Sequence, residues 1–186
     1  MEFDLVGWPA DGPQFQLDHR RFSYAGKFVM SNTGKAVVRE PAPEDHGDEA
    51  ADDIVAAVAF NEDRTDDATA WLRYVTVRRD RRGEGIGARL ARFATARLRE
   101  RGYDRVRIGV NNPFAYHALY KAGFGYTGEQ TGLAELVLAA PADRIAEGYQ
   151  SGLDAYRARE DLDPDERAFL KRKAEAEPPA VIPVPE

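Results

Sequence analysis

The chain contains no cysteine, so disulfide bonds, thiolate nucleophiles and cysteine-ligated zinc or iron–sulfur sites are excluded. It has no run approaching the roughly 20 consecutive apolar residues that a membrane-spanning helix needs. Its first residues, Met1–Asp4, lack the basic and apolar regions of a secretory signal. The three histidines, His19, His46 and His117, are too scattered to suggest a metal site. We therefore expect a cytoplasmic protein with no metal and no membrane contact.

The chain has fewer basic than acidic residues, which gives a formal net charge of −6 at pH 7. An acidic protein is a poor candidate for general nucleic-acid binding, which requires a basic surface. The charge is uneven along the chain: residues 43–67 hold ten acidic residues and only Arg64, whereas residues 78–107 hold eleven arginines. This asymmetry favours an acidic rim and a basic pocket for a polyanionic ligand.

Hydrophobic spacing and turn residues predict the elements. Residues 1–13 are expected to be irregular, followed by extended stretches at 14–21 and 27–30, the second pairing with 36–39 through a turn. The acidic segment 41–52 is expected to be a loop, and the apolar run 53–60 is too short for a helix. Strands are expected at 68–77, 105–110, 124–127 and 133–138, and helices at 86–98, 113–122, 145–156 and 164–176.

Together these elements predict an α/β (α+β) fold. It consists of a mixed, mainly antiparallel, twisted sheet flanked by helices over residues 1–140, with a motif-bearing core at 53–138. Residues 141–186 are expected to form a helical extension that ends in a proline-rich tail. We expect the extension to stabilise the domain; a cover for a substrate cleft and the contact of a homodimer are the alternatives.

The segment Arg82–Gly87, with the sequence Arg-Gly-Glu-Gly-Ile-Gly, suits a phosphate group. It lies between a strand that ends at Val77 and an amphipathic helix. Glycines let the backbone approach a ligand closely, and the free N–H groups of a helix start point at an anion. Four arginines crowd the same turn, and a polyanionic ligand would relieve their mutual repulsion. These are Arg78, Arg79, Arg81 and Arg82.

Two other phosphate loops fit this segment less well. A Walker loop ends in Gly-Lys-Ser/Thr, but Gly87 is followed by Ala88-Arg89. Gly83–Ala88 does match a G-x-G-x-x-A dinucleotide fingerprint. That fingerprint should follow its strand directly and be accompanied by an acidic residue at the end of the next strand, whereas the next strand here ends in Val110-Asn111-Asn112.

Val75-Thr76-Val77 followed by Arg82-x-x-Gly85-x-Gly87 resembles the acetyl-CoA-binding motif of the GNAT superfamily of N-acetyltransferases, whose pattern is Arg/Gln-x-x-Gly-x-Gly/Ala. A second block, Asn112–Phe124, resembles the Asn…Leu-Tyr-x-Lys-x-Gly-Phe segment of that family, with one extra residue between Ala115 and Leu119. The resemblance covers roughly residues 53–138 and extends neither to residues 1–52 nor to the C-terminal extension.

The resemblance implies a GNAT-like fold and transfer of an acetyl group from acetyl-CoA to an amine. In this frame the backbone of Val75 and Val77 holds the acyl and pantetheine part, and Asn112 hydrogen-bonds the pantetheine arm. Tyr120 becomes the candidate general acid, because a phenol with a reference pKa near 10 is protonated at neutral pH. The implied cofactor-binding residues are Val75, Thr76, Val77, Arg82, Gly83, Glu84, Gly85, Ile86, Gly87 and Asn112.

The general base and the acceptor stay open. Candidates for the base, by proximity in sequence, are Glu62, Asp66, Asp67 and His117. Because the chain has no cysteine, direct transfer in a ternary complex is simpler than transfer through a thiol-linked intermediate. The acceptor could be a small molecule, such as a polyamine or an aminoglycoside, or a protein amine. The alternative from another class is a non-catalytic acyl-CoA-binding sensor or scaffold.

Overall fold

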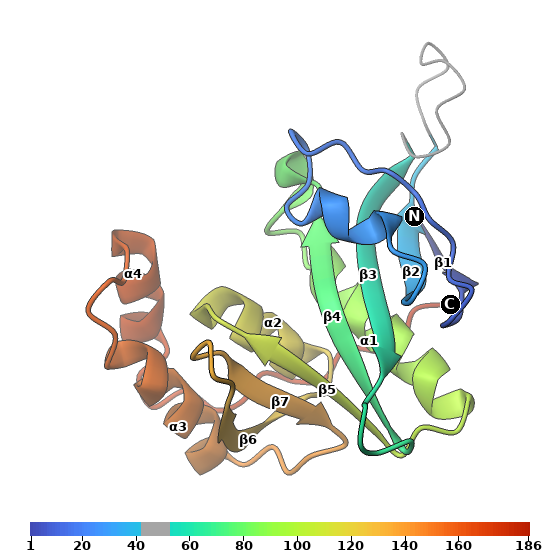
Figure 1. The fold of residues 1–186 in the computed structure, drawn as a ribbon. Helices are drawn as coiled ribbons and strands as arrows, with labels where there is room; N and C mark the ends of the chain where they lie inside the picture. Colours follow the sequence, from blue (N-terminus) through green and yellow to red (C-terminus); the bar gives the residue numbers. More distant parts are fainter. Residues whose placement is uncertain (42–52) are drawn as a thin grey trace. The chain divides into compact units, whose positions relative to one another are not determined.

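The computed structural model describes residues 1–41 and 53–186, so the expected acidic loop lies almost entirely outside the described residues. The chain divides into two compact units (Figure 1). The first unit is Met1–Asp104 with Pro183–Glu186, and the second is Arg105–Ile182. The second unit includes both sides of the domain limit expected near residue 140, and that limit stays a prediction.

Four antiparallel strands in the order β1-β2-β3-β4 form the first unit's sheet. They are β1 (Glu2–Gly7), β2 (Gly34–Arg39), β3 (Ile54–Glu62) and β4 (Thr69–Val77). The apolar run at 54–60 is the buried part of β3. It is buried because both faces of the sheet are covered: α1 (Ile86–Glu100) packs on one face and the segment 15–28 on the other (Figure 1).

The amphipathic helix expected after the glycine loop is α1. Its buried side chains include Ile86, Leu90, Phe93 and Leu98, as the spacing of three and four predicts. Gly102 has a φ of 114° just beyond the helix, a conformation that favours glycine. This helix is therefore anchored along its whole length, which fixes the glycine loop at its start.

Three expectations for the first 39 residues are wrong. Residues 2–7 form β1 because they pair with β2, although nearby glycines and prolines suggested an irregular segment. Residues 14–21 form no strand, and η1 (Ala25–Val29) is a 3-10 helix. The turn before β2 does not join a hairpin: the buried Lys35 ammonium fixes it by donating to Met30 O (2.6 Å) and Thr33 O (3.1 Å).

The second unit has three antiparallel strands in the order β5-β7-β6 and three helices. They are β5 (Arg105–Val110), α2 (Pro113–Lys121), β6 (Gly125–Gln130), β7 (Leu136–Ala140), α3 (Ala146–Arg157) and α4 (Pro164–Arg172). All six were expected from the sequence, although α4 ends earlier than residue 176. The α/β class with mainly antiparallel strands flanked by helices is confirmed. Within the described ranges, no helix is both long and apolar enough to cross a membrane.

The extension after residue 140 packs closely on α2. Gly152 of α3 faces Tyr116 so closely that a Cβ at this position would lie 2.1 Å from the Tyr116 hydroxyl oxygen. That hydroxyl donates to the backbone oxygen of Tyr149 (3.0 Å), and the Tyr156 hydroxyl donates to Val110 O (3.0 Å). Buried polar groups are thus satisfied across the contact, which makes α3 part of the second unit's core.

Candidate active site

The glycine loop leaves its backbone open. Gly83 (φ 85°) and Gly85 (φ 77°) both adopt the left-handed conformation, and no atom lies within 4 Å of a Cβ built on either. Gly85 is the N-cap of α1, and no side chain in the described part of the protein caps this helix start. Gly87 lies close to Val77, whose Cγ2 is 3.3 Å from a Cβ built at position 87. The N–H groups at the start of α1 are therefore open, and the binding of an anion by them stays a prediction.

We expected the loop arginines to repel one another, and the structure corrects this expectation. Arg78 pairs with Asp80 (2.7 Å), and Arg81 forms bidentate contacts with both Glu40 and Glu84. Hydrogen bonds from Arg81 lower the pKa of both glutamates. The carboxylates of the protein itself therefore compensate two of the four arginines, and a ligand is not needed to relieve them.

Arg82 is differently placed. Its Nη2 donates to Ser23 Oγ (2.9 Å) and its Nε to Val77 O (3.3 Å), so both acceptors are neutral. The positive charge of this arginine is thus held beside the glycine loop without a carboxylate among these hydrogen-bond partners. An arginine in this state suits a phosphate oxygen.

Glu40 was missed by the sequence reasoning. It follows β2 directly and reaches Arg81, which stands 41 residues further along the chain. Such a pair leaves no signal in local spacing, because the two residues meet only when β2 and the loop after β4 are folded. Glu40 and Glu84 together hold Arg81 and so brace the turn that precedes α1.

Val75, Thr76 and Val77 form the last part of β4, opposite Val58, Ala57 and Ala56 of β3. The pairing is irregular further up the strand, where Ala59 faces Tyr74 and Phe60 faces Leu72, so Arg73 is skipped. The buried Thr76 hydroxyl has no hydrogen-bond partner among the described residues. A 3-10 helix, η2 (Arg79–Arg81), separates the end of β4 from the glycine loop, so strand, basic turn and glycines follow one another in the order of the motif.

Asn112 begins α2 as its N-cap, and its Oδ1 accepts a hydrogen bond from the Ala115 N–H (2.8 Å). The predicted N-cap with proline at the first helical position is confirmed. Because Oδ1 is used by the helix, the Nδ2 group is the part of Asn112 that remains for a ligand; its contact in the structure is Asn111 Oδ1 at 3.4 Å.

Tyr120 lies one helical turn after Tyr116, with ring centroids 5.0 Å apart, and has no exposed surface. Its hydroxyl oxygen accepts a hydrogen bond from the Tyr126 N–H (2.9 Å) and lies 3.4 Å from the Tyr116 hydroxyl. The Tyr120 hydroxyl therefore acts as an acceptor, and its own hydrogen is left for donation. Because the group is buried, a donation to a ligand requires the surrounding side chains to move.

The four base candidates have other roles or no contact that favours them. Asp66 stabilises its own turn, accepting from Ala68 N (3.0 Å) and Thr69 Oγ1 (2.7 Å). Glu62 accepts from the Tyr103 hydroxyl (3.1 Å), and Asp67 is exposed. His117 Nδ1 lies 2.8 Å from the Tyr149 hydroxyl. In residues 1–41 and 53–186, no three His, Asp or Glu side chains gather as a metal site requires.

The burial of His117 predicts a pH-dependent stability. Desolvation, followed by the nearby Lys173 and Lys121, lowers its pKa from 6.5 to about 4. Below pH 6.5 His117 is protonated in the unfolded chain but stays neutral in the folded protein. The free energy of unfolding therefore falls as the pH drops toward 4. We expect a loss of roughly 2 kcal/mol between pH 7.5 and pH 4.5 in urea unfolding. In a His117→Gln variant this part of the pH dependence should disappear; an unchanged profile would contradict the assignment.

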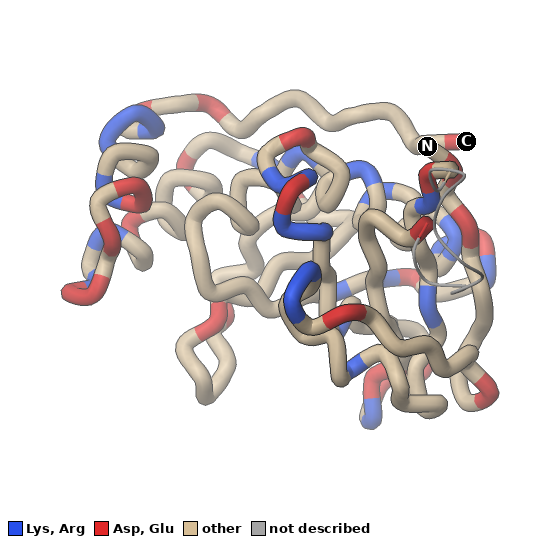
Figure 2. The backbone as a smooth tube through the Cα atoms, turned by 90° about the horizontal axis from the view of Figure 1, so that it is seen from above, with Lys and Arg blue, Asp and Glu red and all other residues tan. Residues whose placement is uncertain are grey.

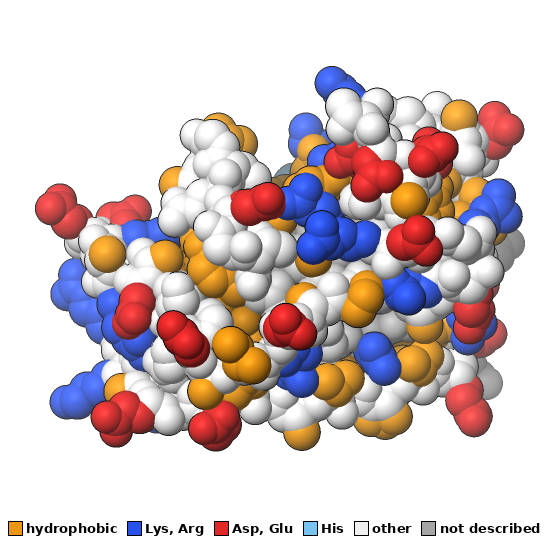
Figure 3. Space-filling model, turned by 90° about the horizontal axis from the view of Figure 1, so that it is seen from below, with side chains coloured by type: hydrophobic (Ala, Val, Ile, Leu, Met, Phe, Trp, Pro, Cys, Tyr) orange, Lys and Arg blue, Asp and Glu red, His pale blue; other side chains and the backbone are white. Residues whose placement is uncertain are grey.

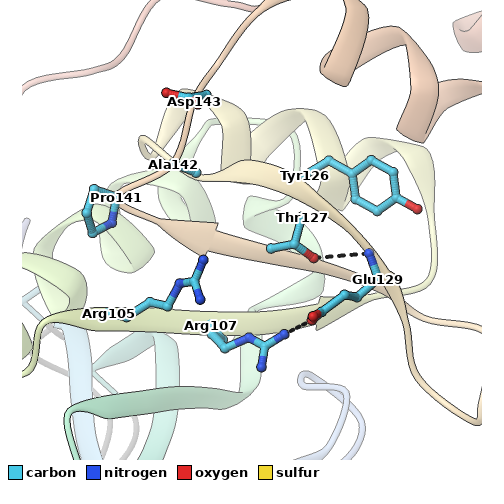
Figure 4. A pocket seen from close by; sticks show the side chains of 8 residues that line it. All are labelled: Arg105, Arg107, Tyr126, Thr127, Glu129, Pro141, Ala142 and Asp143. Atoms are coloured by element: carbon cyan, nitrogen blue, oxygen red, sulfur yellow. Dashed lines mark hydrogen bonds and ion pairs between the residues drawn. The ribbon is translucent and has the colours of Figure 1, made fainter.

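A cavity of about 590 Å³ lies in the second unit, beside the ends of β5 and β6 (Figure 4). Arg105 and Arg107 point into it from β5, and Arg107 pairs with Glu129 of β6. The cavity also borders Asp143, so its cationic and anionic residues balance. No residue that the sequence singled out lines this cavity.

The family model that matches this chain is that of the family whose motifs the sequence resembles. The model of the Acetyltransferase (GNAT) family matches residues 9–126. The similarity therefore begins at residue 9, which corrects the expectation that it does not extend to residues 1–52. Among solved structures, nourseothricin acetyltransferase is 22% identical (TM-score 0.46), with 60% of this chain and 66% of that chain covered. An IAA acetyltransferase from Bacillus cereus is 20% identical (TM-score 0.43; 57% and 76%), and the PaiA N-acetyltransferase from Thermoplasma acidophilum, in complex with coenzyme A, is 18% identical (TM-score 0.40; 48% and 55%). No curated protein matches significantly.

Proposed function

This chain belongs to the GNAT family of acetyltransferases, and on that premise we propose that it moves an acetyl group from acetyl-CoA directly to an amine acceptor. The chain is thus an acetyltransferase with acetyl-CoA as its co-substrate. The observation that carries the proposal is the open glycine loop, whose uncapped N–H groups stand at the start of α1. A pyrophosphate group fits there, because the helix start supplies donors and the glycines leave room.

We assign the donor-binding roles as follows. The N–H groups from Arg82 to Gly87 bind the pyrophosphate, with the Arg82 side chain beside them. The backbone of Val75 and Val77, at the end of β4, binds the acyl and pantetheine part. The Nδ2 group of Asn112 donates to the pantetheine arm, since its Oδ1 caps α2.

In the proposed reaction the amine nitrogen attacks the thioester carbonyl carbon. The C–N bond forms, the C–S bond breaks, and the amine loses one proton to a base or a water molecule. Tyr120 donates its hydroxyl proton to the departing thiolate sulfur. This role is supported by the acceptor geometry of its oxygen, which leaves the hydrogen free to be given away. General acid catalysis of this kind contributes about 10²–10⁴-fold in rate.

A panel of amines tests the proposal. Purified full-length protein is incubated with acetyl-CoA and polyamines, aminoglycosides, lysine or peptides with free N-termini, and thiol release is measured. We expect thiol release above the hydrolysis background with at least one of these amines. Binding of acetyl-CoA by calorimetry without turnover for any amine would instead favour the non-catalytic sensor.

A further inference from the structure

The cavity between the end of α3 and α4 is strongly basic. It has a volume of about 340 Å³ and is lined by four cations and two leucines. These are Arg157, Arg159, Arg167, Lys171, Leu162 and Leu170. Among the described residues that line it, none is acidic. Figure 3 shows Lys and Arg side chains gathered at the left edge of the molecule, over the end that carries these helices.

Two of the cations come from α4. Arg167 and Lys171 are four residues apart, so they lie on the same face of the helix. Both side chains are exposed, and within residues 1–41 and 53–186 no hydrogen-bond or ion-pair partner contacts their charged groups. The helix starts with acidic residues and ends with basic ones (Figure 2). Lys171 thus stands in the basic last turn.

The other two cations are held in place by the fold. Arg157 Nη2 donates to Leu170 O (3.1 Å), and its Nη1 donates to Asp154 (2.7 Å). Arg159 donates to two neutral backbone oxygens, Asn111 O (2.6 Å) and Ala134 O (2.7 Å). The segment between α3 and α4 also carries the exposed Glu160 and Asp161, which do not line the cavity. Arginines fixed in this way lose little side-chain freedom when they bind a ligand.

From this arrangement we propose that the cavity binds a phosphate-bearing small molecule. Four cations share the space while a single carboxylate, on Asp154, pairs with one of them, so they repel one another unless an anion is bound. A phosphate group accepts charge-assisted hydrogen bonds from several donors at once. Leu162 and Leu170 provide an apolar wall for the organic part of the ligand. None of these residues belongs to the glycine loop, so the proposal does not rest on acetyl transfer.

Titration of the full-length protein with pyrophosphate, inorganic phosphate and adenosine monophosphate tests the proposal. A Gly85→Glu background suppresses binding at the glycine loop, so the binding that remains reports the cavity. We expect Arg167→Gln with Lys171→Gln to weaken the remaining binding at least about tenfold. The matched control, Arg20→Gln with Arg172→Gln, removes the same charge outside the cavity and should leave affinity within about twofold.

The outcomes separate the sources of the phosphate. Tighter binding of adenosine monophosphate than of inorganic phosphate supports an organic phosphate that uses the leucine wall. Equal affinity supports capture of the free ion. Equal weakening by the cavity pair and the control pair, or binding to nucleic acid with none to the small phosphates, would overturn the proposal.

Discussion

Gly85→Glu is expected to weaken binding of acetyl-CoA at least about 100-fold, or about 2.7 kcal/mol. Gly85 has a φ of 77° and caps α1, so a glutamate there places a carboxylate where the N–H groups meet the pyrophosphate. The two anions repel each other, and the glutamate carboxylate competes with the pyrophosphate for the same N–H donors. The left-handed backbone also costs a residue with a Cβ roughly 1–2 kcal/mol. Because no atom lies within 4 Å of the new Cβ, the variant should still fold.

Two controls separate these effects in calorimetry. Gly85→Ala introduces the same backbone strain without a charge, so it should lose much less affinity. Gly128→Glu places the same residue at another glycine with φ 84° and open space, in β6, and should leave affinity unchanged. If Gly85→Glu keeps its affinity for acetyl-CoA, the loop does not bind the pyrophosphate. Equal losses of affinity in all three variants would instead indicate damaged folding.

Tyr120→Phe is expected to lower kcat by about 10²–10⁴-fold while CoA affinity stays within about twofold. The hydroxyl is the proposed proton donor, and it also satisfies the part-buried N–H of Tyr126. Its removal therefore costs stability as well, about 1–3 kcal/mol for an unsatisfied buried donor. Turnover has to be measured well below the melting temperature of the variant so that unfolding does not contribute.

Tyr116→Phe is the matched control for this variant. Tyr116 is equally buried on the same helix, and its hydroxyl donates to the Tyr149 backbone oxygen, so its removal also takes away a buried hydrogen bond. If Tyr120 is the acid, kcat falls far more in Tyr120→Phe than in the control. Similar small losses of kcat in both variants would give Tyr120 a purely structural role.

Local signals in the sequence were sufficient wherever an element carries its own start, spacing and stop. β5 has the predicted limits, α1 has the predicted buried stripe, and Asn112 caps α2 as expected. The same holds for the glycine loop, because its left-handed backbone conformation is one that glycine adopts far more readily than other residues. These segments need little information from the rest of the chain.

The sequence could not reveal features that arise from distant partners. β1 exists because of its ladder with β2, and Arg81 is neutralised by a glutamate 41 residues away. The burial of Tyr120 likewise depends on Tyr149, which comes from a helix that follows two strands later. The motif predicted which tyrosine to consider, but its surroundings depend on tertiary packing that no local spacing records.

The last residues of the second unit have a practical consequence for producing the protein. Arg144 Nη2 joins Tyr120 O (2.8 Å) to Pro179 O (2.6 Å), and the Ile182 N–H bonds Lys121 O (2.9 Å). A gene that stops after α4 would therefore remove the Ile182 N–H from Lys121 O, at the end of the helix that carries Tyr120, and Pro179 O from Arg144. Low solubility of a protein trimmed in this way should be traced to the lost contacts of the tail before a loss of activity is assigned to catalysis.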